Sequence, residues 1–162
     1  MSEEIAEITW NPKTMRISNA VFSRNSLRFN CRQCAIFCCR LGGPKVHWKD
    51  VERIKQAGHE TVDFLDPSSN EEDGRGGVLS RKQDGSCVFL QPDIEAGKYR
   101  CGVYAARPAL CQLYPFEFEQ TGVNQGVLKF IPCCNGLNAR DSFLVNKGFI
   151  EKHLLKAIAE LF

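Results

Sequence analysis

The first thirty residues alternate weakly between apolar and polar side chains. Such an alternation predicts short strands and turns, which lead into the cysteine-rich segment that follows. The apolar positions that carry the alternation are Ile5, Ile8, Trp10, Ile17, Val21, Phe22, Leu27 and Phe29.

A helical spacing replaces the alternation at residues 48–57, where Val51 and Ile54 are set among charged side chains. This spacing predicts a short amphipathic helix that Gly58 ends. The polar segment 67–77, with the sequence PSSNEEDGRGG, predicts a solvated loop.

A β-hairpin is predicted next, with strands at 78–82 and 86–90 and a turn at 83–85. Pro108 suits the first turn of a helix, because its missing N–H is not needed there. We therefore expect a short helix at 109–113.

Two further strands are expected at 116–118 and 127–131, joined by a glycine-bounded loop at 122–126. The last segment has the clearest helical pattern, and Asp141 is placed to cap a helix that begins at Ser142. The apolar face of this helix is formed by Phe143, Ile150, Leu154, Ile158 and Leu161.

Length and composition fit one domain over residues 1–162, because 43% hydrophobic residues can bury a core of ordinary size. Within it we expect N-terminal strands at 1–30, a metal-binding core at 31–137 and a C-terminal helix at 141–162. The predicted fold class is α+β: a small, irregular, metal-stabilised domain with short strands around a cysteine cluster.

Cysteine is the residue type that changes this picture, since the chain contains nine. Four fall in the run CRQCAIFCC, at Cys31, Cys34, Cys38 and Cys39. The remaining five are Cys87, Cys101, Cys111, Cys133 and Cys134. Thiols at such close spacing are either metal ligands or disulfide partners.

The start of the chain favours metal ligands over disulfides. MSEEIAEITW is acidic and polar, unlike a secretory signal, and no apolar run is long enough to span a membrane. We therefore expect a cytoplasmic protein without membrane contact, in a compartment that keeps thiols reduced. The odd number of cysteines agrees with this expectation.

Positive charge is concentrated in residues 11–55, which hold ten Lys or Arg residues but only Asp50 and Glu52 as acids. One interpretation is that the arginines offset the charge of metal-bound thiolates. The other is a surface for RNA or for an acidic protein partner. The arginines nearest the cysteine run are Arg24, Arg28, Arg32 and Arg40.

The ligand type leaves zinc and iron–sulfur open, because all-sulfur sites suit both. His47, His59 and His153 lack ligand spacing, so none is predicted to bind metal, with His47 the strongest of the three candidates. The adjacent Cys38 and Cys39 favour an iron–sulfur cluster, expected to be 4Fe–4S, since neighbouring side chains rarely converge on one ion. Two four-cysteine zinc sites would use eight of the nine thiols equally well.

Four motifs follow one another in a recognisable order. The run CRQCAIFCC (31–39) is followed by RLGGP and by Asp50 at the start of the predicted helix. DGSCVFL (84–90), CGVYAARPALCQLYPF (101–116) and CCNGL (133–137) complete the series. Over about residues 29–137 the chain resembles the YkgJ-type cysteine-cluster family, a family described as zinc- or iron-chelating.

The chain departs from the family's usual C-x-x-C-x-x-C-C opening. Here Ala35, Ile36 and Phe37 separate Cys34 from the following pair. This extra residue leaves open which of the two paired cysteines ligates. Cys133 is also additional and would be the unliganded thiol.

The resemblance implies a set of metal ligands and one neighbouring cation. The ligands would be Cys31, Cys34, Cys38, Cys39, Cys87, Cys101, Cys111 and Cys134. Arg107 lies between two of them, where it could donate hydrogen bonds to cluster sulfurs. The alternative for this arginine is a surface ion pair.

The implied function is a metal-binding protein in electron transfer, in an accessory role or in protein modification. Flagellin lysine N-methylases carry a similar cysteine domain associated with an iron–sulfur cluster. The alternative is a structural zinc module that binds RNA, through residues 11–55, or an unknown protein partner. The sequence does not identify a catalytic residue or a substrate.

Overall fold

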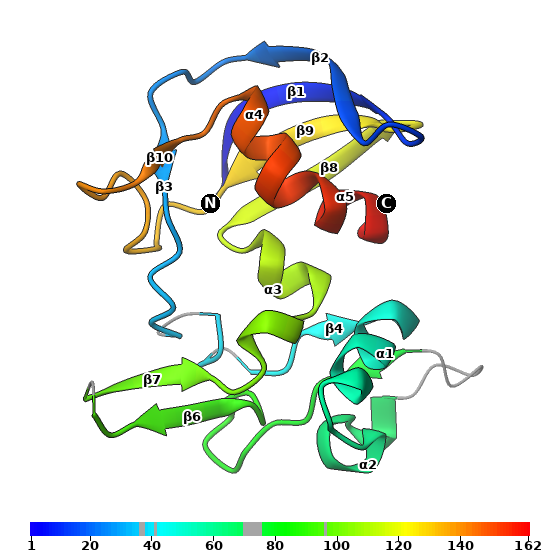
Figure 1. Cartoon of the computed structure of the whole chain (residues 1–162), viewed down its shortest axis with the longest axis vertical. Coiled ribbons are helices and arrows are strands. Elements are labelled where there is room, and N and C mark those ends of the chain that lie inside the picture. The colour runs from blue at the N-terminus through cyan, green and yellow to red at the C-terminus, as the bar shows by residue number, and fades with distance from the viewer. Residues whose placement is uncertain (36–37, 41, 70–75, 96) are drawn as a thin grey trace. The chain divides into compact units, whose positions relative to one another are not determined.

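The computed structural model describes residues 1–35, 38–40, 42–69, 76–95 and 97–162 (Figure 1). It divides into two compact units. Unit 1 combines residues 1–32 with residues 113–162, and unit 2 is formed by residues 33–112. The expectation of a single domain stays a prediction.

A four-stranded antiparallel sheet forms the base of unit 1, in the order β2-β1-β9-β8. Its strands are β1 (Glu3–Asn11), β2 (Arg16–Phe22), β8 (Phe116–Gly122) and β9 (Gln125–Phe130). Alternate residues of β9 are buried, as expected for a sheet with one covered face. Both sequence-predicted strands at 116–131 are confirmed, although β8 is longer than expected and the connecting turn is shorter.

A C-terminal helical segment shares its core with this sheet (Figure 1). It comprises α4 (Lys147–Phe149), a π-helical turn (Ile150–Leu154) and α5 (Leu155–Leu161). Buried aromatic and aliphatic residues of both elements meet there, including Phe149 and Phe116, whose ring centroids are 6.2 Å apart.

The predicted start of this helix at Ser142 is wrong. The side chain of Asn146 caps the helix by accepting a 2.9 Å hydrogen bond from the backbone N–H of Phe149. Asp141 instead forms an ion pair with Arg32. Phe143, expected on the buried helix face, is 59% exposed in a short strand. That strand, β10 (Phe143–Leu144), pairs with β3 (Arg28–Phe29).

Unit 2 has shorter elements. Its helices are α1 (Trp48–Gln56), α2 (Thr61–Phe64) and α3 (Ala109–Leu113), with 3-10 turns at Pro67–Ser69 and Tyr104–Ala106. Its strands form two pairs, β4 (Lys45–Val46) with β5 (Gly77–Val78) and β6 (Leu90–Asp93) with β7 (Lys98–Cys101). The predicted helices at 48–57 and 109–113 are therefore confirmed.

Of the hairpin predicted at 78–90, only the turn and one bridge beside it are formed. Lys82 N–H donates to the Ser86 carbonyl at 2.7 Å, and Arg81 and Cys87 form an isolated bridge. Regular pairing ends there, since β5 stops at Val78 and the next strand begins at Leu90. Of the predicted loop 67–77, residues 70–75 lie outside the described residues.

The fold class is α+β, as predicted: short strands in small sheets, short helices and a helical C-terminal segment. Among the described residues, no helix has both the length and the apolar character needed to cross a membrane.

Candidate metal centre

All nine cysteines lie within the described residues, and each is a free thiol. Six of them belong to unit 2, and five of these six gather in its core region: Cys38, Cys39, Cys87, Cys101 and Cys111. The first two come from the cysteine run, whereas the other three come from segments far along the chain. The gathering therefore depends on tertiary structure.

Backbone hydrogen bonds bring these distant segments together. The N–H of Cys87 donates to the carbonyl oxygen of Cys39 at 2.8 Å. Strand β6 begins at Leu90, three residues after Cys87, and pairs with β7, so that Leu90 lies opposite Cys101. The N–H of Gly102 closes this hairpin by donating to the Phe89 carbonyl at 2.7 Å. Figure 1 shows β6 and β7 side by side.

Four of the five thiols interact electrostatically in every pairwise combination. These four are Cys38, Cys87, Cys101 and Cys111. The fifth, Cys39, is hydrogen-bonded to both Cys38 and Cys101. The arrangement thus consists of four thiols that would repel one another as thiolates, and a fifth whose single S–H proton can be donated to either of two neighbours.

Hydrogen bonding and burial divide the thiols into two classes. The hydrogen bond with Cys39 lowers the pKa of Cys101 to about 6 and that of Cys38 to about 7. The same bonds raise the pKa of Cys39. Burial raises the pKa of Cys87 and Cys111. Two sulfurs are therefore ready to ligate at neutral pH, while the others must lose a proton first.

The surroundings of the thiols are apolar. Cys39 and Cys87 are buried in the unit 2 core, and Cys38 and Cys101 pack against it. Neighbouring core residues include Val46, Phe89 and Val103. Such surroundings exclude water, so that charge on the sulfurs must be offset by a metal or by a nearby cation.

One such cation is Arg107. Its guanidinium lies 3.9 Å from the centre of the Tyr104 ring. It also attracts the thiolates of Cys101 and Cys111, lowering the pKa of both, although burial dominates at Cys111. Its Nε is buried and has no hydrogen-bond partner among the described residues. A bound group rich in sulfur would supply that partner.

The spacing of the sulfurs bears on the kind of metal group that fits. Within the described part of the chain, no three cysteine sulfurs lie within 4.8 Å of one another. A single tetrahedral zinc, with Zn–S of about 2.3 Å, would hold its four sulfurs roughly 3.8 Å apart. The candidate thiols would have to move closer together to hold one zinc ion in this way.

Three further predicted ligands, Cys31, Cys34 and Cys134, do not belong to this group of five thiols. Cys31 and Cys134 belong to unit 1 and pack against its core. Cys34 is half-buried in unit 2, between Gln33 and Ala35, which both have positive φ angles, of 53° and 54°. Non-glycine residues rarely adopt such angles, so the backbone here is held in a tight, unfavourable loop. Ligation by these three thiols stays a prediction.

Cys133, expected to be the additional thiol, has a partner of its own. Its Sγ lies 3.1 Å from the hydroxyl oxygen of Tyr114 in a hydrogen bond. Both residues belong to unit 1.

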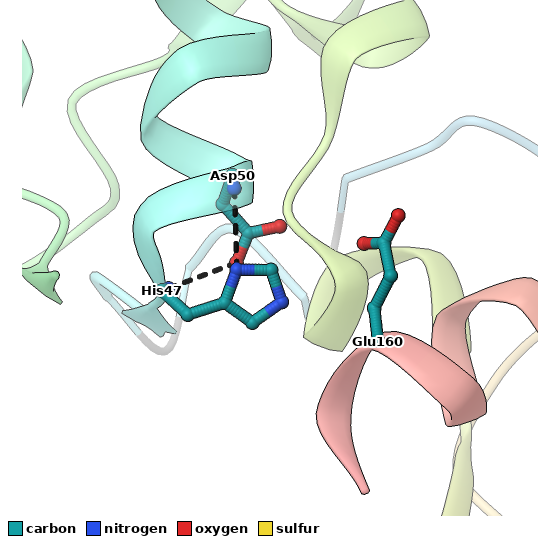
Figure 2. Close-up of side chains that lie close together, drawn as sticks. All are labelled: His47, Asp50 and Glu160. Atoms are coloured by element: carbon teal, nitrogen blue, oxygen red, sulfur yellow. Dashed lines mark hydrogen bonds and ion pairs between the residues drawn. The ribbon is translucent and has the colours of Figure 1, made fainter. Parts of the chain in front are cut away.

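The histidines have structural contacts. His47 is the N-cap of α1: its Nδ1 accepts from the Asp50 N–H at 3.2 Å. Figure 2 shows this residue with Asp50 at the start of the helix. His59 packs edge-on against Phe89, and the rings of His153 and Phe149 are 4.8 Å apart.

The arginines of the basic segment also have partners. Arg24 pairs with Glu3 at 3.3 Å, Arg32 pairs with Asp141, and Arg40 lies 4.9 Å from the Tyr99 ring centre. Arg28 donates to the Ser142 carbonyl. Binding of RNA or of an acidic partner by this segment stays a prediction.

Sequence reasoning missed the role of Cys39 and the contacts that organise the site. The bond between Cys39 and Cys87 joins residues 48 positions apart and leaves no local pattern. The sequence identifies Asp50 only as part of a motif. In the structure its Oδ1 accepts a hydrogen bond from the Ala109 N–H at 2.9 Å, a contact that no sequence pattern indicates.

Comparison with known protein families identifies one match. The family model CxxCxxCC, described as "Putative zinc- or iron-chelating domain", matches residues 30–135. Neither the curated proteins nor the solved structures contain a match to this chain.

Proposed function

Because the chain belongs to the CxxCxxCC family of zinc- or iron-chelating domains, we propose that it is an iron–sulfur protein whose cluster is held by the unit 2 thiols. The ligands would be Cys38, Cys87, Cys101 and Cys111, all from unit 2.

The observation that carries this proposal is the gathering of these four thiols from distant segments of unit 2, where the Cys87 N–H donates to the Cys39 carbonyl at 2.8 Å and Leu90 lies opposite Cys101. A 4Fe–4S cluster takes four thiolates, one on each iron. Four neighbouring sulfurs in or beside an apolar core supply that number, and bound metal would offset the charge of their thiolates.

Two further residues fit the same group. Cys39 can donate its S–H toward Cys38 or Cys101. The buried Nε of Arg107 can donate toward a cluster sulfur. Hydrogen bonds to sulfur stabilise added negative charge and so raise a cluster's reduction potential.

Among the roles predicted from the sequence, electron transfer needs the fewest additional parts. A bound cluster supplies the redox chemistry itself, and the protein needs only to hold it near the surface. Cys101 is half-buried at the end of β7, whose other residues are exposed. One ligand therefore lies close to solvent, where a partner protein could approach.

The test is anaerobic purification followed by iron, sulfide and zinc analysis. We expect iron and acid-labile sulfide in equal amounts, with visible absorbance that decreases on reduction by dithionite. Colourless protein with stoichiometric zinc and no iron would reject the cluster. It would favour the structural zinc module, whose RNA or protein partner is also a prediction from the sequence.

A further inference from the structure

Asp50 is a buried acid whose contacts exceed what its helix requires. Its side chain is 1% exposed. One oxygen, Oδ2, accepts from the His47 N–H at 3.1 Å and completes the capping box of α1. Figure 2 shows the two side chains that form this box. Helix capping therefore accounts for one carboxylate oxygen and not for the other.

The second oxygen connects α1 with the start of α3. Oδ1 accepts from the Ala109 N–H at 2.9 Å and from Arg53 Nη1 at 2.9 Å. Ala109 is the first residue of α3, and Cys111 follows two residues later in the same turn. Asp50 thus caps a second helix, 59 residues further along the chain.

Arg53 extends this contact to the other side of Pro108. Its Nη1 also donates to the Arg107 carbonyl oxygen at 3.2 Å. The backbone is therefore held at Arg107 and again at Ala109. Between them Pro108, which has no N–H, restricts the chain further. The held segment begins at the cation, Arg107, and ends at Ala109, two residues before Cys111.

We propose that Asp50 is a positioning residue for this centre, an inference that rests on the proposed metal-binding function. Through Ala109 and Arg53, Asp50 fixes Cys111 and Arg107 in place before metal arrives. A site that is already ordered binds more tightly, because ordering costs nothing further at the moment of binding.

The test compares D50A, D50N and R53Q with the unaltered full chain. D50A removes both carboxylate oxygens. D50N keeps one acceptor for Ala109, and R53Q keeps the Ala109 contact but removes the one to Arg107. We expect the largest effect from D50A. The matched control is N146A, which also removes a helix cap but lies in unit 1, outside the unit that carries the proposed ligands.

The first measurement uses metal-free protein and the alkylation of individual thiols, read by mass spectrometry. We expect D50A to speed the alkylation of Cys111 relative to that of Cys87, which a separate backbone bond to Cys39 holds. General loosening of unit 2 would speed both equally. Equal acceleration, or none, would therefore contradict the proposal.

The second measurement uses protein reconstituted with ferrous iron and sulfide, and follows cluster loss to a chelator. Loss should be about 10–100-fold faster in D50A, the range found when residues that orient metal ligands are altered. The N146A control should lose the cluster at the unaltered rate.

The two proposals can fail separately. Unaltered protein that takes up neither iron nor zinc would reject the proposed function, while the alkylation ratio would still decide the role of Asp50. Normal cluster lifetime and normal Cys111 protection in a folded D50A would reject the positioning role alone. If D50A does not fold, D50N and R53Q decide by the same criteria.

Discussion

The backbone N–H of Cys87 donates a 2.8 Å hydrogen bond to the carbonyl oxygen of Cys39. The bond joins peptide groups, so replacing either side chain leaves it intact. Serine at one of these positions can therefore remove a sulfur without separating the segments that meet there. Cysteine variants of unit 2 should accordingly report on metal binding more than on folding.

Replacing Cys101 by serine should remove most of the bound iron while leaving a folded protein. The variant loses one of the four mutually interacting thiols and the acceptor of a Cys39 hydrogen bond. Elemental analysis and circular dichroism would measure the two effects. C133S is the matched control, because Cys133 bonds to Tyr114 in unit 1. Iron content that falls equally in both variants would contradict the proposed ligand set.

In metal-free protein at pH 7, iodoacetamide should react with Cys101 and Cys38 before Cys87 and Cys111. The pKa of Cys101 is lowered to about 6 and that of Cys38 to about 7, so both carry substantial thiolate at this pH. Burial raises the pKa of the other two and keeps them as thiols. Time-resolved peptide mapping would measure the order, and fastest labelling of Cys87 would be the opposite result.

Asn146→Ala should lower the free energy of unfolding by about 1 kcal/mol, the typical effect of losing an N-cap side chain. The side chain of Asn146 accepts from the Phe149 N–H at 2.9 Å. Asp141→Ala should change stability much less, because the Arg32 pair is exposed to solvent. Urea denaturation would compare the variants. A larger effect at Asp141 would indicate that the sequence-predicted cap was correct.

Stability should fall in acid partly because of Glu151. Its carboxylate accepts from the Ile17 N–H at 2.9 Å, and this bond is the main cause of a pKa below the usual glutamate value of 4.5. A lowered folded-state pKa stabilises the protein above about pH 4.5. That contribution is lost as the pH falls through the lowered value. The E151Q variant should show a flatter dependence of the urea midpoint between pH 7 and pH 3, and an unchanged slope would contradict this role.

Local patterns were enough to predict several elements. The helix at Trp48–Gln56 follows from the spacing of Val51 and Ile54, both of which are buried. The start of the C-terminal helix could not be predicted in this way, because Asp141 and Asn146 are both good caps. The helix begins after Leu144 because residues 143–144 form β10, which pairs with β3 more than one hundred residues earlier in the chain.

The candidate site was predictable only in outline. Spacing and resemblance identified the cysteines, since thiolate chemistry is visible in residue type alone. Their grouping was not predictable, because it depends on long-range backbone bonds such as that between Cys39 and Cys87. The hydrogen bond between Asp50 and Ala109 is equally long-range, so no pattern among neighbouring residues could predict it.

The discontinuous make-up of unit 1 has a consequence for how the protein is synthesised. Strand β1 lies between β2 and β9 in the sheet, so the sheet cannot close until residues 125–130 have left the ribosome. Residues 33–112 of unit 2 emerge earlier and as one uninterrupted piece. Domains usually form in the order of their synthesis. The thiol-bearing middle of the chain has therefore been synthesised in full before the N-terminal strands can complete their sheet.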